Sequence, residues 1–221
     1  MMKRIVFIAA MCAFMGAPAL ADLYVSVPGK ACPYFAGQTF PVPSATTGDS
    51  EDYHLDQGDS ATMPPSIGVT GFGGALLSIT AVGVWGHPAL SGPDGYAGYD
   101  PTHQEYIDLG ISPMIGTPLN ALLGVFLTDA TPVAFSAPSS LTFGVSDMTS
   151  PLLQQTFVIG SSLQNITIPS GATRLFFGLN NGYEWTNNVG SVEVNVVPVP
   201  AAVLLGMLGL SVTGLKLRKF A

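Results

Sequence analysis

The sequence predicts an all-β protein: an antiparallel jelly-roll β-sandwich, flanked by an N-terminal signal helix and a C-terminal hydrophobic sorting helix. Short apolar runs alternate with turn-forming segments through the body of the chain. The 26 glycines and 18 prolines are spread along the chain rather than collected in one linker, so turns recur throughout. No segment between the runs keeps the period of a crossover helix, and this disfavours a parallel α/β fold.

The first 21 residues have the pattern of a secretory signal peptide. Lys3 and Arg4 precede an apolar stretch over residues 5–15, and the small residues Ala19 and Ala21 follow it. This stretch is shorter than the roughly 20 residues that a membrane span needs, which disfavours a retained anchor. We therefore expect residues 1–21 to be removed and the exported chain to begin at Asp22.

The body of the chain, residues 22–196, is predicted to form one domain. Eight runs in it have the length and composition of strands, and we expect them to pair as an antiparallel sandwich. The last run alternates most clearly: Val192, Val194 and Val196 are expected to face a core. Cys32 is the one cysteine of this body, so the core rather than a disulfide must hold it together. The predicted strands are 23–27, 76–84, 120–127, 140–145, 155–159, 164–168, 174–179 and 191–196.

The body is strongly acidic. Apart from the two basic residues of the leader and three near the C-terminus, it holds only Lys30 and Arg174 against 14 acidic residues, a net charge of −12. Such a surface repels phosphate backbones, so nucleic acid is not an expected partner. The charge suits solubility outside a cell and it suits attraction of cations; it does not distinguish between them.

Two long connections, 33–68 and 85–118, interrupt the strand rhythm, and loops of this length are often functional. The first has the composition of a flexible surface excursion. The second combines aromatic rings with carboxylates, a mixture that sugar sites use, although the same residues are common in ordinary loops. The residues concerned are Trp85, Tyr96, Tyr99 and Tyr106, with Asp94, Asp100, Glu105 and Asp108.

Two asparagine pairs, Asn180 with Asn181 and Asn187 with Asn188, flank a short loop near the end of the body. Calcium takes six to eight oxygen ligands, often from side chains and backbone carbonyls of one irregular loop. Asparagine also favours turns because it tolerates left-handed backbone conformations. Both interpretations are open from the residues, which by themselves favour the turn.

This stretch, "LFFGLNNGYEWTNNVGSVEVNV", together with "ITAVGVWGHP", "SGPDG", "LNALLGVFL" and "IPSGATRLFFGL", resembles the galactose-binding-like sandwich of PA-IL-like bacterial lectins. The resemblance implies calcium-dependent binding of an extracellular polysaccharide or other glycan. It implies five calcium ligands: the carbonyls near His87 and of Glu184, and the side chains of Asn181, Asn187 and Asn188. Asn181 stands where that family has aspartate, so we expect weak calcium binding.

The same comparison of motifs also shows what this chain lacks. The His-x-x-Gln pair with which the family helps to grip galactose is absent, because His103 and Gln104 are adjacent. The alternative function is therefore a structural surface protein that keeps the sandwich without a sugar site. We do not expect an enzyme, because the sequence holds no nucleophile elbow, zinc motif or Cys–His arrangement.

Residues 197–221 are predicted to be a sorting signal. An apolar run over 201–215 is followed by Lys216, Arg218 and Lys219, which is a marginal membrane span with its positive end retained. The segment resembles the C-terminal signal of PEP-CTERM proteins, in the variant whose motif here reads "VPVPAA". The resemblance implies processing by an exosortase, transient anchoring in the inner membrane, and a place at the surface or in the matrix of a Gram-negative bacterium. A buried core helix is the alternative, disfavoured by three glycines in the run.

Overall fold

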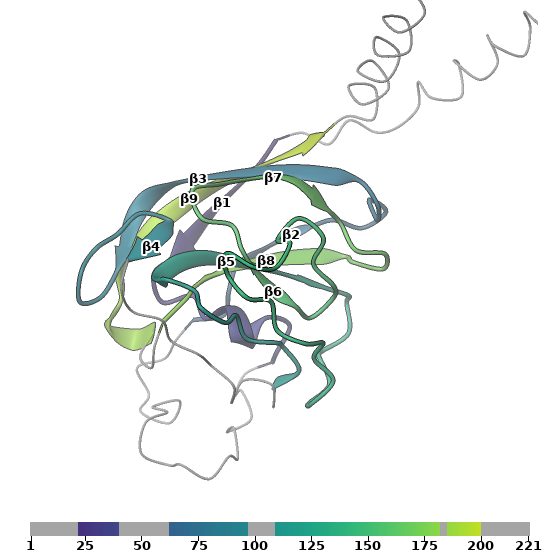
Figure 1. The fold of residues 1–221 in the computed structure, drawn as a ribbon, viewed down its shortest axis with the longest axis horizontal. Helices are drawn as coiled ribbons and strands as arrows, with labels where there is room; N and C mark the ends of the chain where they lie inside the picture. Colours follow the sequence, from purple (N-terminus) through teal and green to yellow (C-terminus); the bar gives the residue numbers. More distant parts are fainter. Residues whose placement is uncertain (1–21, 40–61, 97–108, 182–184, 200–221) are drawn as a thin grey trace, which may run out of the picture.

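The computed structural model describes residues 22–39, 62–96, 109–181 and 185–199, which form two antiparallel sheets packed face to face (Figure 1). The first sheet has the strand order β1-β9-β3-β7. The second has the order β2-β8-β5, with β4 and β6 both paired to the far side of β5. The strands are β1 (Leu23–Pro28), β2 (Ser66–Gly68), β3 (Leu76–Gly86), β4 (Asp94–Tyr96), β5 (Leu119–Leu127), β6 (Thr156–Val158), β7 (Ser162–Thr167), β8 (Arg174–Leu179) and β9 (Val189–Val199).

The connectivity is that of a jelly roll, as predicted. The chain passes from one sheet to the other after β1, β2, β3, β6, β7 and β8, so that sequence neighbours mostly lie in opposite sheets. All paired strands run antiparallel, as the double Greek key of a jelly roll requires. The described parts of the connections include the short 3-10 helices η1 (Pro33–Phe35) and η4 (Trp185–Asn187). The predicted flanking helices, in 1–21 and 197–221, fall almost wholly outside the described residues.

Seven of the eight predicted strands are confirmed, and the prediction of a strand at 140–145 is wrong. There Thr142 accepts backbone hydrogen bonds from Val145 and Ser146, and Gly144 has a φ of 72°, so the segment turns. Thr142 forms an isolated bridge with Ile115 that does not extend into a ladder. β2 and β4 were not predicted, because three residues are too short to show alternation. β9 runs to Val199, past the Val196 at which we expected the body to end.

The core lies between the sheets and is built by alternating side chains. Val192, Val194 and Val196 are fully buried, which confirms the inward face predicted for β9. Phe126 and Phe157 stack with ring centroids 5.5 Å apart. Cys32 is also buried there, and its burial raises the pKa of the thiol.

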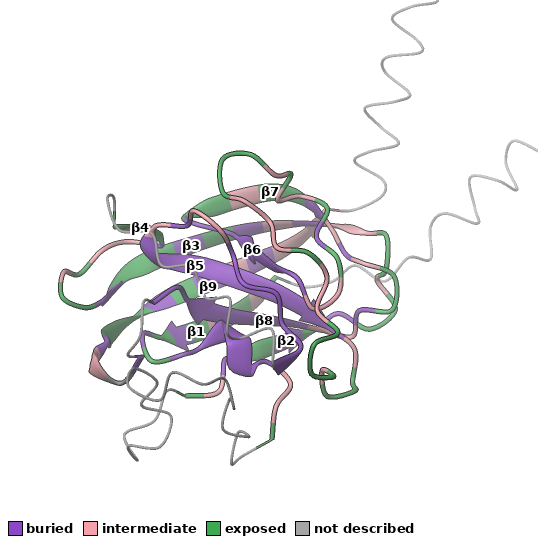
Figure 2. Ribbon diagram, turned by 60° about the horizontal axis from the view of Figure 1, so that its bottom comes forward, coloured by how far each residue is buried: buried purple, intermediate pink, exposed green. Residues whose placement is uncertain are grey.

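The two sheets differ in what covers their outer faces. β5 is buried along its whole length (Figure 2), and its Leu123 packs with Met114 and Val158 in a second small cluster apart from the main core. On the first sheet the outward side chains of β3, such as Val82 and Val84, are exposed. The strands β5, β6 and β8 are therefore covered on both faces, whereas β2 and β4 in the same sheet and the outward side of β3 have residues open to solvent.

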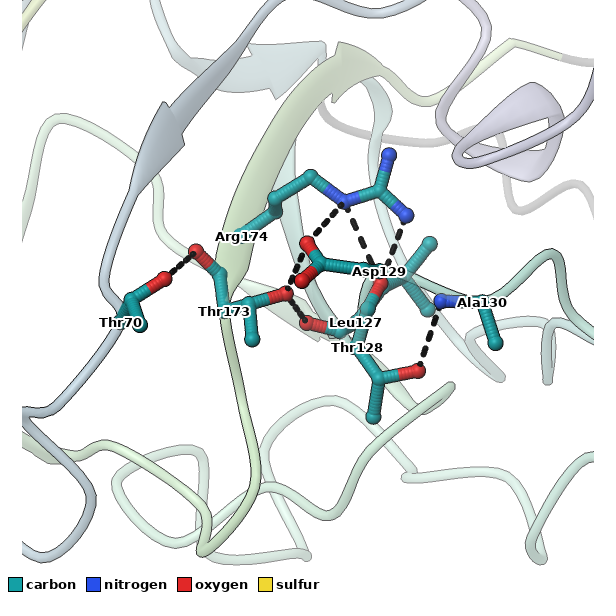
Figure 3. A network of polar contacts seen from close by, with 7 residues as sticks. All are labelled: Thr70, Leu127, Thr128, Asp129, Ala130, Thr173 and Arg174. Atoms are coloured by element: carbon teal, nitrogen blue, oxygen red, sulfur yellow. Dashed lines mark hydrogen bonds and ion pairs between the residues drawn. The ribbon is translucent and has the colours of Figure 1, made fainter.

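At one end of the sandwich, Arg174 closes the beginning of β8 against the end of β5 (Figure 3). Its guanidinium donates to the Thr128 carbonyl at 3.2 and 2.6 Å and stacks over the Phe176 ring at 5.0 Å. Asp129 lies 3.9 Å from the guanidinium and accepts a hydrogen bond of 2.8 Å from Thr173. This network fixes the end of the sandwich opposite to the asparagine pairs.

Among the residues that the structure describes, no helix has the length and apolar character needed to cross a membrane.

Candidate functional site

Five asparagines gather at the end of the sandwich where β3 and β8 stop and β5 and β9 start. Gly86 pairs with Val189 in one sheet and Leu122 with Leu179 in the other, and a hydrogen bond from the Trp85 indole to the Asn120 carbonyl joins the two sheets here. We call this region the asparagine-rich end; its members are Asn120, Asn180, Asn181, Asn187 and Asn188. All are buried except Asn187, which is partly buried.

Asn180 directly follows β8 and is held by the segment that leads into β5. Its backbone N–H donates to the Ala121 carbonyl at 2.8 Å. Its side-chain Nδ2 donates to the carbonyls of Thr117 and Pro118 at 3.3 and 3.0 Å. The side-chain Oδ1 is buried and has no hydrogen-bond partner within the described part of the chain. Since a buried oxygen of this kind is costly to leave unsatisfied, it is a place for a water, an ion or a ligand group.

Asn120 connects three strand ends, a role that no motif in the sequence indicates. Its N–H donates to the Asn180 carbonyl at 2.7 Å, and its own carbonyl accepts a hydrogen bond of 2.8 Å from the Trp85 indole. Its Nδ2 donates to the Ala89 carbonyl at 3.0 Å. The residue has a φ of 64°, a left-handed conformation that asparagine tolerates better than most residues.

The Asn120 amide also requires a glycine beside it. A Cβ on Gly86 would overlap the Asn120 side-chain amide, far inside contact distance. Asn120 and Gly86 together therefore fasten the loop after β3, which begins with His87, onto the start of β5.

Asn187 ends the short helix η4, and Asn188 follows it. The backbone N–H and the side-chain Nδ2 of Asn188 both lie 3.3 Å from the Trp185 carbonyl and donate to it. Trp185 donates its indole N–H to the Leu179 carbonyl at 2.8 Å, and its ring meets Tyr34 edge-on at 6.1 Å. The aromatic pair thus anchors the loop to the core. The hydrogen bonds of Asn188 stabilise the turn, which is the role that the sequence left open as the alternative to calcium binding.

The structure places four of the five predicted calcium ligands. Asn181, Asn187 and Asn188 lie at the asparagine-rich end, and the exposed His87 follows Gly86, the residue paired with Val189. The fifth, Glu184, lies outside the described residues.

The donor set fits calcium in kind, although it brings no charge. Calcium prefers oxygen ligands, and the side-chain oxygens of Asn120, Asn180 and Thr117 are buried with no hydrogen-bond partner in the described ranges. In the same part of the chain, no group of three or more His, Cys, Asp or Glu residues is placed to hold a metal. Neutral oxygens bind calcium more weakly than carboxylates do, so any site here belongs to the weak class.

The predicted sugar-contacting residues of segment 85–108 separate into two groups. Trp85 is fully buried, so the expectation that it offers a ring to a sugar is wrong; its indole holds Asn120 instead. Tyr96 is 46% exposed and pairs with Leu119 at the start of β5, beside the asparagine-rich end. Asp94 accepts a hydrogen bond of 2.6 Å from the Ser161 N–H, so one carboxylate oxygen is already engaged. Tyr99, Asp100, Glu105, Tyr106 and Asp108 lie outside the described residues.

Comparison with solved structures finds similarity to the EclA N-terminal domain, described as a PllA-like lectin. The two chains are 13% identical, the alignment covers 80% of this chain and 95% of that chain, and the TM-score is 0.36. Neither the protein-family models nor the curated proteins include a match to this chain.

Proposed function

We propose that this protein is an exported, non-enzymatic carbohydrate-binding module whose site is the asparagine-rich end. The observation that carries the proposal is the gathering of five asparagines from three separate segments at one end of the sandwich, next to the exposed Tyr96. Amide groups on a rigid frame match the hydroxyls of a sugar, and an exposed ring matches its apolar face. The expected ligand is an extracellular polysaccharide.

Calcium is proposed to assist this binding. Asn181, Asn187 and Asn188 would supply side-chain oxygens, with the carbonyls near His87 and of Glu184 completing the set that the lectin resemblance implies. When bound, the ion would offer coordination positions to sugar hydroxyls. The −12 charge of the body supports attraction of cations to this surface.

The proposed setting is the outer surface or matrix of a Gram-negative cell. The leader over 1–21 would direct export, and the segment 197–221 would be read by an exosortase after a transient stay in the membrane. Weighing the protein from an exosortase-bearing host tests this part separately, because a mature mass that still includes residues 201–221 contradicts processing.

A structural surface protein without a sugar site is the second candidate, and one observation favours it. The Nδ2 atoms of Asn120, Asn180 and Asn188 all donate to backbone carbonyls, which is what asparagines retained only for turns and strand ends would do. The two candidates differ in whether any glycan binds.

A glycan array separates them. The full chain should bind at least one polysaccharide class in millimolar calcium and lose that signal in chelator. Binding that persists unchanged in chelator retains the glycan proposal and rejects the calcium part. Silence across a broad array, including polysaccharide from the producing cell, favours the structural candidate.

A further inference from the structure

β1 is an edge strand that nothing in the described part of the chain covers on its free side. It pairs with β9 over all six of its residues, in regular register from Leu23 with Val196 to Pro28 with Ser191. Its sequence, LYVSVP, holds no charged residue. Tyr24 is 70% exposed, and the core-facing Leu23 and Val25 are only partly buried. A regular, uncharged strand with open backbone groups is a template for pairing with another strand.

The other described edges are short, bulged or occupied. β2, β4 and β6 have three residues each. β7 has a register shift against β3, and Asn165 within it has a φ of 60°. The end of β7 is also taken, because Thr167 donates its N–H to the Thr149 carbonyl at 2.7 Å. These are the devices that natural sheets use to prevent edge pairing; β1 has a proline at its end and Asp22 directly before its start.

The direction of the backbone groups along β1 follows from one hydrogen bond. Gly29 donates its N–H to Gly190 of β9 at 2.9 Å, so alternate residues back along the strand also direct their backbone groups to β9. The backbone groups of Ser26 and Tyr24 therefore point to the free edge. Pro28 has no N–H to offer, and its carbonyl already accepts a hydrogen bond from Ala31 at 2.9 Å.

We propose that a second copy of this chain binds here, with the two β1 strands antiparallel about a twofold axis at Tyr24. In this register Tyr24 faces Tyr24 of the other copy, and Asp22 faces Ser26, so every outward backbone group is used. A register shifted toward the C-terminus brings Pro28 into the ladder and loses hydrogen bonds. The result is one continuous sheet through both copies, which covers Leu23 and Val25 and sets the two tyrosine rings side by side.

Cysteine cross-linking tests both the contact and its register. Tyr24→Cys, in the full chain with Cys12→Ser, places two thiols across a pair whose Cα atoms are about 5.5 Å apart, within the range that a disulfide spans. Ser26→Cys is the matched control: it is exposed on the same strand, but its two copies would be offset by about 13 Å along the strands. The native Cys32 is buried and stays unreactive in both.

Mild oxidation should convert Tyr24→Cys to a species of twice the monomer mass on a non-reducing gel and leave Ser26→Cys monomeric. Cross-linking of Ser26→Cys alone, or of both variants equally, overturns the register or shows random collision. Sedimentation equilibrium of the unmodified full chain gives the independent reading. A dimer that Tyr24→Lys dissociates supports the proposal, because lysine on an edge opposes pairing, and a wild-type monomer at all concentrations overturns it.

Discussion

Replacing Asn120 by alanine should destabilise the protein more than replacing it by glycine. Alanine removes the hydrogen bond of 3.0 Å to the Ala89 carbonyl, and this costs about 1 kcal/mol. Alanine must also adopt the φ of 64°, which asparagine tolerates better because its amide can hydrogen-bond locally, so part of the roughly 1–2 kcal/mol cost of a left-handed residue is added. The sum is about 2 kcal/mol, a large share of a typical domain stability of about 5–15 kcal/mol. Glycine loses the hydrogen bond without the backbone strain, so we expect about 1 kcal/mol.

Urea unfolding of the two variants measures this difference directly. Tryptophan fluorescence is a suitable signal, because the Trp85 indole donates to the carbonyl of residue 120 in the folded protein. In a parallel thermal scan, the expected fall in melting temperature is roughly 4–8 °C for alanine and a few degrees for glycine. The reasoning is refuted if the alanine variant is as stable as the glycine variant, since the left-handed backbone would then carry no cost.

Calcium binding, glycine packing and the buried thiol each give a further prediction. Calcium at ten times its dissociation constant should raise the free energy of unfolding by about 1.4 kcal/mol and the melting temperature by roughly 3–6 °C. The substitutions Asn187→Ala and Asn188→Ala should abolish this effect. An identical melting temperature in calcium and in chelator would show that calcium does not bind the folded state. Gly178→Ala should cost about 1–3 kcal/mol, because its Cβ would lie 2.6 Å from the Pro33 nitrogen, whereas Gly68→Ala, which meets nothing within 4 Å, should be nearly neutral; equal stabilities would contradict the packing. Burial raises the pKa of the Cys32 thiol, so the folded state keeps its proton while the unfolded chain ionises above the ordinary value of about 9. The free energy of unfolding should therefore fall above that pH by about 1.4 kcal/mol per pH unit. If urea unfolding of a Cys32→Ala variant shows the same fall with pH, the assignment to Cys32 is refuted.

The strands were predictable wherever burial imposes alternation over several residues. Val192, Val194 and Val196 show this in β9, where one side is core and the other solvent. The segment 140–145 has strand-like composition, but Gly144 and hydrogen bonds within the loop make it turn. Neither the conformation of Gly144 nor those hydrogen bonds can be predicted from composition. β2 and β4 exist because β8 and β5 offer them partners, and that is a property of the assembled sheets.

The candidate site was predictable only in part, for a related reason. Asn187 and Asn188 form a conspicuous pair in the sequence, and the structure places them at the same end as Asn181. Asn120 lies in an apolar run, and its importance arises from the meeting of β3, β5 and β8. Trp85 was predicted to contact a sugar, but it is buried, because an aromatic residue in a loop-like segment can equally well place its ring in the core.

The most direct test of the proposed function measures glycan affinity in variants at the two ends of the sandwich. With the best ligand from the array, calorimetric titration should show binding by the wild type and loss of binding by the double variant Asn187→Ala, Asn188→Ala. Asp129→Asn, at the opposite end beside Arg174, should bind as the wild type does. Equal affinities for all three proteins, with each shown to be folded, would contradict a glycan site at the asparagine-rich end.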